Sequence, residues 1–78
     1  MITWRFADVN KLPEESGIYM ILNILNNHKY VGSTNNFKRR LTRHRGELRK
    51  DKHHSTYLQR AYNKYGEDKF IIYILERC

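Results

Sequence analysis

Apolar and polar positions predict two strands joined by a short turn in the first half of the chain. Residues 17–25 (GIYMILNIL) are apolar, aromatic or β-branched at positions of both parities, which is typical of a strand covered on both faces. Residues 26–28 (NNH) are polar, and Asn tolerates a positive φ, so a turn is expected there. Residues 29–33 (KYVGS) then complete a β-hairpin. Pairing around this turn places Tyr19 and Tyr30 on one face, offset along the strands if the turn is tight and opposite each other if the loop is wider.

A helix with one apolar and one cationic side should follow the hairpin. Asn36 is a suitable N-cap, and the helix is expected to run from Phe37 to about Asp51. Its inward stripe at helical spacing comprises Phe37, Leu41, His44 and Leu48. Arg40 lies one turn before His44, at the edge of that stripe. The other positions are almost entirely cationic, namely Lys38, Arg39, Arg43, Arg45, Arg49 and Lys50.

A second helix and a third strand complete the predicted core. The helix is expected to begin near Ser55 or Thr56, with Thr56 and Gln59 at capping-box spacing, and to end at Gly66 in a left-handed conformation. Its apolar face comprises Leu58, Ala61, Tyr62 and Tyr65. Residues 70–75 (FIIYIL) form the third strand.

The order β-β-α-α-β predicts an α+β fold with a small three-stranded antiparallel sheet and flanking helices. This core is expected to occupy residues 17–78, and residues 1–16 are expected to be an irregular lead-in that contains Pro13.

The composition of the chain indicates what kind of partner it binds. Fifteen Lys and Arg against eight Asp and Glu give a net charge of +7, which favours a polyanion such as nucleic acid over a purely solubilising basic surface. Cys78 is the only cysteine, so an internal disulfide and a Cys-based zinc site are excluded. Neither a signal peptide nor an apolar stretch of membrane-spanning length is found, so a cytoplasmic protein without membrane contact is expected.

Five side chains could carry phosphodiester chemistry. Arg40 could hold a phosphate oxygen and oppose developing charge, while the phenols of Tyr19 and Tyr30 or the imidazoles of His44 and His53 could relay a proton. Each also has an ordinary structural explanation. Tyrosines in strands usually pack, a histidine on an inward stripe usually belongs to the core, and an arginine on a basic helix is usually solvated. Residue chemistry alone does not decide the function.

The spacing of these residues resembles the GIY-YIG nuclease family. Residues 17–19 (GIY) and 30–32 (YVG) resemble its two signature triplets, with Val31 where Ile is typical. Arg40 falls where the family's catalytic arginine is found, and His44 falls where members carry His or Tyr.

The resemblance extends beyond the two triplets. His53 and residues 58–66 (LQRAYNKYG) are similar to a loop histidine and a helix of the phage and intron-encoded homing endonucleases in this family. Together the matching features run from about Gly17 to Leu75, which is most of the chain.

The resemblance implies the catalytic domain of an endonuclease that hydrolyses double-stranded DNA with one divalent metal, Mg²⁺ or Mn²⁺. Tyr19 would be the leading general base, assisted by His44, although Tyr19 and Tyr30 could exchange roles. Otherwise Tyr30 would position water or phosphate, Arg40 would hold the phosphate, and His53 would support the site from its loop. Sequence-independent phosphate contacts are expected from Lys38, Arg39, Arg43, Arg49 and Lys50.

One family element has no counterpart in the sequence. The family's metal ligand is a glutamate on a helix after the third strand, and Glu47, Glu67 and Glu76 do not match its position. No metal ligand is therefore assigned, and a C-terminally truncated domain with weak or no cleavage is expected. The alternatives are a non-catalytic nucleic-acid-binding module on the same scaffold, or a structural fragment. The residues assign no oligomeric state.

Overall fold

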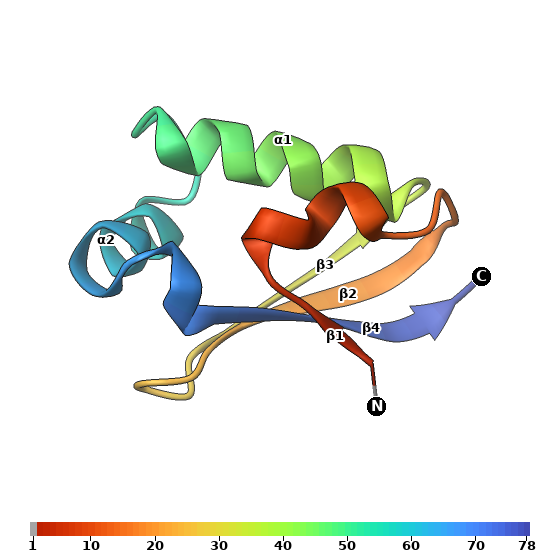
Figure 1. The fold of residues 1–78 in the computed structure, drawn as a ribbon, viewed down its shortest axis with the longest axis horizontal. Helices are drawn as coiled ribbons and strands as arrows, with labels where there is room; N and C mark the ends of the chain where they lie inside the picture. Colours follow the sequence, from red (N-terminus) through yellow and green to blue (C-terminus); the bar gives the residue numbers. More distant parts are fainter. Residues whose placement is uncertain (1) are drawn as a thin grey trace.

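Four antiparallel strands form a sheet, and the helices lie on one side of it (Figure 1). The computed structural model describes residues 2–78. The elements in chain order are β1 (Thr3–Trp4), a 3₁₀ helix η1 (Phe6–Lys11), β2 (Gly17–Asn23), β3 (Lys29–Thr34), α1 (Phe37–Arg49), α2 (Thr56–Tyr65), a 3₁₀ helix η2 (Glu67–Lys69) and β4 (Phe70–Arg77). The strand order is β1-β4-β2-β3. The predicted α+β class is confirmed, with one strand more than expected. No helix among residues 2–78 has both the length and the apolar character of a membrane span.

The hairpin places the two signature tyrosines on one face, as predicted. Tyr19 lies opposite Gly32, and Tyr30 lies opposite Ile21, so the two tyrosines are offset along the strands rather than directly paired. The turn uses Asn27 at φ +61°, a conformation that asparagine tolerates. The buried Asn23 ends β2, two residues before the predicted end.

The prediction that β2 is covered on both faces is wrong. Its burial alternates strictly, with Tyr19 and Ile21 buried and Ile18, Met20 and Leu22 only half-buried. The reason is the arrangement in Figure 1, where the helices cover a single face of the sheet. Apolar residues at both parities therefore do not require two covered faces. Tyr19, the one β2 residue with a predicted catalytic role, points to the face that the helices cover.

A β-bulge lies beside Tyr19. Ile18 pairs with Glu76 and Tyr19 pairs with Ile74, so Leu75 of β4 has no partner in β2. An extra residue of this kind increases the local twist and changes where neighbouring side chains point. The bulge therefore contributes to the direction in which Tyr19 leaves the sheet.

The two helices begin where capping side chains satisfy their first free N–H groups. The Asn36 side chain accepts from the Arg39 N–H at 3.0 Å, as predicted, and the predicted stripe of α1 is buried. For α2 the capping-box prediction is wrong, because the Ser55 hydroxyl accepts from the Leu58 N–H and leaves the side chain of Gln59 to other partners. The chain leaves α2 through Gly66 at φ +92° and ψ 157°, outside the left-handed helical region that was expected.

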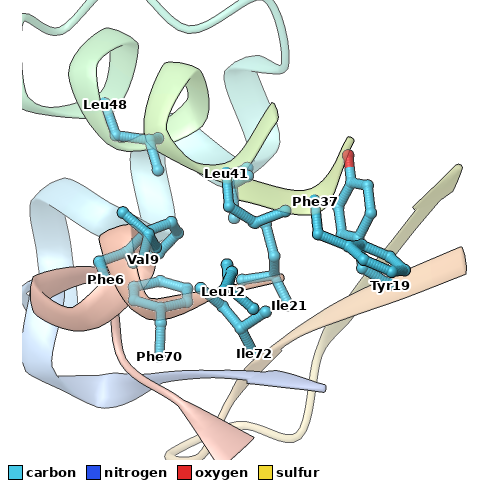
Figure 2. Packing of buried hydrophobic residues seen from close by; sticks show 11 residues of the cluster. Phe6, Val9, Leu12, Tyr19, Ile21, Phe37, Leu41, Leu48, Phe70 and Ile72 are labelled. Atoms are coloured by element: carbon cyan, nitrogen blue, oxygen red, sulfur yellow. The ribbon is translucent and has the colours of Figure 1, made fainter. Parts of the chain in front are cut away.

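The N-terminal residues are part of the fold, so the prediction of an irregular lead-in is wrong. β1 pairs with β4, and Phe6, Val9 and Leu12 are buried in the core (Figure 2). The Phe6 ring meets that of Phe70 edge-on at 6.0 Å. These three apolar residues recur every third position. That spacing matches the three residues per turn of a 3₁₀ helix and neither the period of an α-helix nor that of a strand.

Removal of the Phe6 side chain should therefore destabilise the protein as much as truncation of other core residues does. We expect Phe6→Ala to lower the free energy of unfolding by about 3–5 kcal/mol, because a fully buried ring is lost and a cavity remains. The exposed Asn10→Ala in the same 3₁₀ helix is the control and should change stability by less than about 0.5 kcal/mol. Urea denaturation measures both, and equal stability of the two variants would contradict a core role for this segment.

Candidate active site

The centre of the site is a buried contact between β2 and α1. Tyr19 is 1% exposed and projects from the sheet toward α1 (Figure 2), where its Oη lies 2.7 Å from Nε2 of His44. His44 is 2% exposed on the inward stripe of α1. The same periodicities that build the core, two in the strand and 3.6 in the helix, therefore bring a phenol and an imidazole together.

Two further hydrogen bonds extend this pair into a relay. Nδ1 of His44 lies 2.6 Å from Nε2 of His53, which belongs to the loop between α1 and α2. Nδ1 of His53 accepts the backbone N–H of Ser55 at 3.0 Å. The relay thus runs from the Ser55 backbone through His53 and His44 to Tyr19. Three of the five predicted site residues belong to it.

The Ser55 backbone fixes the direction of every proton in this relay. A backbone N–H can only donate, so Nδ1 of His53 carries no hydrogen and a neutral His53 must carry it on Nε2. That hydrogen is donated to Nδ1 of His44, which leaves the hydrogen of His44 on Nε2 and directs it to the Tyr19 oxygen. Tyr19 is therefore a hydrogen-bond acceptor from His44, and its own hydroxyl hydrogen is free to point elsewhere.

The site keeps both histidines neutral, as this assignment requires. Burial, together with the neighbouring His53 and Arg40, lowers the pKa of His44 to about 3. Burial also lowers the pKa of His53. Burial raises the pKa of the Tyr19 phenol, and the Arg40 cation opposes that rise.

Tyr30 joins the same site through a different histidine. Its Oη lies 3.1 Å from Nε2 of His54, and its ring meets the ring of His44 edge-on at 5.7 Å. His54 stacks on His53 at 4.4 Å, and Nδ1 of His54 lies 4.0 Å from a Glu47 carboxylate oxygen. The two signature tyrosines are thus held by two imidazoles, His44 and His54, that both stack on His53.

Arg40 lies at the junction of two pockets beside the relay. A pocket of about 340 Å³ is lined by Arg40, Arg43, His44, Glu47 and His54. A second, of about 230 Å³, is lined by Thr34, Asn35, Arg39, Arg40 and Arg43. Nε of Arg40 is buried and has no hydrogen-bond partner within residues 2–78. A buried donor without a partner raises the free energy of the folded state. A ligand oxygen that accepted a hydrogen bond from this N–H would remove that penalty.

The residues predicted to contact phosphates occupy two sides of α1. Arg39 and Arg43 line the pockets, and Lys50 is exposed just after the helix. Arg49 instead donates from Nε and Nη2 to the two carboxylate oxygens of Glu67 at 2.7 and 2.8 Å. Helical spacing places Lys38 on the same side as Arg49, away from the pockets. The contacts of all five with DNA stay predictions.

One group of side chains has the composition of a metal site. Ligand atoms of His44, Glu47 and His53 lie within 4.8 Å of one another. Mg²⁺ prefers oxygen ligands, and only Glu47 supplies them. A neutral His53 bound to metal through Nε2 would also need its hydrogen on Nδ1, where the Ser55 N–H already donates. The residues therefore fit a hydrogen-bonded relay and do not fit Mg²⁺.

The family described as the GIY-YIG catalytic domain matches residues 15–78. The chain belongs to the GIY-YIG family. The family is the one that the spacing of these residues indicated. In this member of it, the side chains predicted for the site lie close together.

The most similar relatives of this GIY-YIG domain include two intron endonucleases. Intron-associated endonuclease 1 of Enterobacteria phage T4 is 52% identical over 52 residues, and a probable intron-encoded endonuclease 1 of Neurospora crassa is 42% identical over 65 residues. These alignments cover 67% and 83% of this chain but only 21% and 20% of the relatives, so the chain spans about a fifth of their length.

Solved structures agree with the sequence relatives. The catalytic domain of the homing endonuclease I-TevI superposes with a TM-score of 0.78 at 47% identity, covering 82% of this chain and 68% of that one. A mutant of the same catalytic domain superposes with a TM-score of 0.76 at 48% identity, covering 82% and 65%. The predicted similarity to the phage and intron-encoded branch is confirmed.

Sequence reasoning missed the residue that holds the loop histidine. The Gln59 Oε1 accepts the backbone N–H of His53 at 3.1 Å, while its Nε2 donates to the Leu48 carbonyl at 3.0 Å and to the Asn63 side chain. Gln59 thereby ties the end of α1, the loop and α2 together. The sequence shows only a glutamine beside Leu58, and the capping-box prediction assigned it a different role.

The glycine of the second GIY-YIG triplet makes room for the first tyrosine. A Cβ at Gly32 would lie 2.5 Å from Tyr19 Oη, closer than atoms can approach. We expect Gly32→Ala to displace the phenol from His44 and to cost about 1–3 kcal/mol of stability through overpacking. Proton NMR should lose the hydrogen-bonded His44 Nε2–H signal.

Gly46→Ala is the matched control for that change. A Cβ at Gly46 meets nothing within 4 Å, so this substitution in α1 should stabilise the domain by about 0.5–1 kcal/mol through helix propensity. A Gly32→Ala protein that keeps both its stability and the imidazole signal would contradict the packing argument.

The buried neutral His44 should also make stability fall in acid. Between pH 6.5 and about 3 the unfolded chain binds a proton on this ring that the folded chain does not, so stability falls as the pH is lowered through this range. The limiting slope is about 1.4 kcal/mol per pH unit for one proton. Urea denaturation from pH 7 to pH 4 should show a smaller slope for His44→Gln, and identical slopes would disprove the assignment.

Proposed function

We propose that this GIY-YIG domain is the catalytic domain of a homing-type endonuclease that hydrolyses phosphodiester bonds of double-stranded DNA. The observation that carries the proposal is the relay ending at Tyr19, beside an Arg40 whose buried Nε–H has no partner among the described residues. The names of the relatives support the reaction class, since both are endonucleases. The net charge of +7 supports a polyanionic substrate.

Arg40 is the phosphate-binding group in this proposal. Its free Nε–H and its guanidinium charge adjoin both pockets, so a non-bridging oxygen placed there would satisfy the buried donor. The same charge would stabilise the additional negative charge that develops on phosphorus oxygens as water attacks. Arg39 and Arg43 line the adjacent pocket and would contact neighbouring phosphates.

Tyr19 is the proposed general base. The role of His44 follows from the direction of the hydrogen bond between the two side chains. Because His44 donates to the phenol oxygen, it stabilises the phenolate rather than accepting the phenol proton. The phenol first gives its proton to solvent, against the burial that raises its pKa. The resulting phenolate takes a proton from water as the water oxygen bonds to phosphorus. The bond from phosphorus to the leaving strand's oxygen breaks, and that oxygen takes a proton from solvent.

Tyr30 and His53 have supporting roles in the proposal. The Tyr30 hydroxyl, held by His54 at 3.1 Å, would orient the attacking water or a phosphate oxygen. His53 would act only through His44, by holding it in the tautomer that donates to Tyr19. The resemblance implies Mg²⁺ or Mn²⁺, but the group of His44, Glu47 and His53 does not fit Mg²⁺, so each step is assigned to the chain's own side chains.

The second candidate is a non-catalytic nucleic-acid-binding module. The observation that favours it is the same poor fit of His44, Glu47 and His53 to Mg²⁺. This second candidate predicts weak, salt-sensitive DNA binding and little or no cleavage.

Relaxation of supercoiled plasmid in the presence of Mg²⁺ tests the roles of Arg40 and Tyr19. We expect Arg40→Ala to lower the nicking rate about 10²- to 10³-fold, as for loss of other transition-state charge contacts. Tyr19→Phe should lower it about 10²- to 10⁴-fold through loss of the base. The control Lys11→Gln removes one exposed cation from η1 and should keep the rate within about twofold.

Different results separate the two candidates. Nicking by Arg40→Ala at the rate of the unsubstituted protein would refute the proposed phosphate role. DNA binding without any nicking under Mg²⁺ or Mn²⁺ would favour the binding module.

A further inference from the structure

An exposed aromatic and cationic surface lies outside the proposed active site, on α2 and the β2–β3 turn. Tyr57 is 56% exposed, although large aromatic side chains are usually covered. Its ring stacks on that of His28 from the turn, with centroids 5.3 Å apart and planes at 30°. A shallow pocket of about 270 Å³ is lined by Asn26, His28, Tyr57, Arg60, Ala61, Lys64 and Tyr65.

Helical spacing aligns the ring with two cations. Tyr57, Arg60 and Lys64 stand at positions i, i+3 and i+7 of α2, so they share one side of the helix. Nζ of Lys64 lies 5.2 Å from the centre of the Tyr65 ring, which extends the same line. This side of α2 therefore presents two cations between two aromatic rings.

These two cations have no acidic or hydrogen-bonding partner among the described residues. Neither Arg60 nor Lys64 forms a salt bridge or a side-chain hydrogen bond within residues 2–78, and the pocket lining contains no acidic residue. Arg49 shows the contrast, since its guanidinium is bound to Glu67. A polyanion could therefore bind Arg60 and Lys64 without displacing an internal partner.

The surface is continuous with the active site through Tyr30. Tyr30, His28 and Tyr57 line one small apolar hollow between β3 and α2. The Tyr30 hydroxyl contacts His54, which precedes Tyr57 by three residues. A strand leaving the Arg40 pocket past Tyr30 would thus meet the Tyr57 ring next.

We propose that this surface binds a single-stranded segment of the DNA next to the cut, with a base stacked on Tyr57 and phosphates on Arg60 and Lys64. The proposal rests on the nuclease function proposed above. Aromatic rings bind successive bases of single strands without sequence preference, and adjacent cations follow the backbone. A paired base already has neighbours on both faces, so an intact duplex would use the two cations but not the ring.

Fluorescence anisotropy with a labelled oligothymidylate and a duplex of equal length tests this surface. Tyr57→Ala in the 78-residue chain should weaken binding of the single strand roughly 5- to 100-fold, the range expected for loss of one stacked base, and leave duplex binding within about twofold. Tyr57→Phe keeps the ring and should bind like the unsubstituted chain. Circular dichroism should show all variants folded, because Tyr57 is exposed.

Salt titration tests the two cations separately. Arg60→Gln and Lys64→Gln should each reduce the slope of log affinity against log salt by about 0.7 for the single strand. Lys11→Gln, on η1, is the control and should leave the slope unchanged.

Three results would overturn the proposal. They are unchanged single-strand affinity of Tyr57→Ala, equal weakening for single strand and duplex, and salt slopes unaffected by both cation substitutions. Failure of the nuclease function is distinguishable, because plasmid nicking would then be absent while Tyr57→Ala still selectively weakened single-strand binding.

Discussion

The chemistry of the site depends on a single backbone N–H group, that of Ser55. Because this group can only donate, it determines which nitrogen of His53 carries hydrogen, and through the 2.6 Å contact between the two histidines it determines the same for His44. Tyr19 then receives a hydrogen bond instead of giving one. The tautomer of His44 is thus set by peptide geometry at the start of α2, with two imidazoles between the Ser55 N–H and the phenol.

Contacts outside the relay fix the position of the Ser55 N–H group. Ser55 caps α2 with its own hydroxyl, so its position is tied to the start of the helix. Gln59, one turn into α2, bonds the loop at His53 and the last turn of α1 at Leu48. The geometry of the relay therefore follows the packing of the two helices, and the burial that keeps its imidazoles neutral comes from the same packing.

Local periodicity was sufficient to predict part of this arrangement. The inward stripe of α1 placed His44 toward the sheet, and the pairing of the hairpin placed Tyr19 and Tyr30 on one face. Contacts between distant elements had no such signal. Neither spacing nor residue type indicates that His54 meets Tyr30, that Gln59 holds His53, or that the N-terminal 3₁₀ helix completes the core. Those contacts exist only after the helices, the loop and the sheet have come together.

The placement of cations on α1 has a consequence for the encounter with a polyanion. On one side of the helix Arg45 donates to the Phe6 carbonyl and Arg49 is paired with Glu67. On the other, Arg39 and Arg43 border the Arg40 pocket, and Arg43 pairs at 3.3 Å with Glu47, the only acid in the pocket lining. Three arginines, Arg39, Arg40 and Arg43, against this one carboxylate give the pocket side of α1 a net positive charge and a positive potential. The domain would tend to turn its pocket toward a polyanion during diffusion, before any contact is made, and added salt would weaken that alignment.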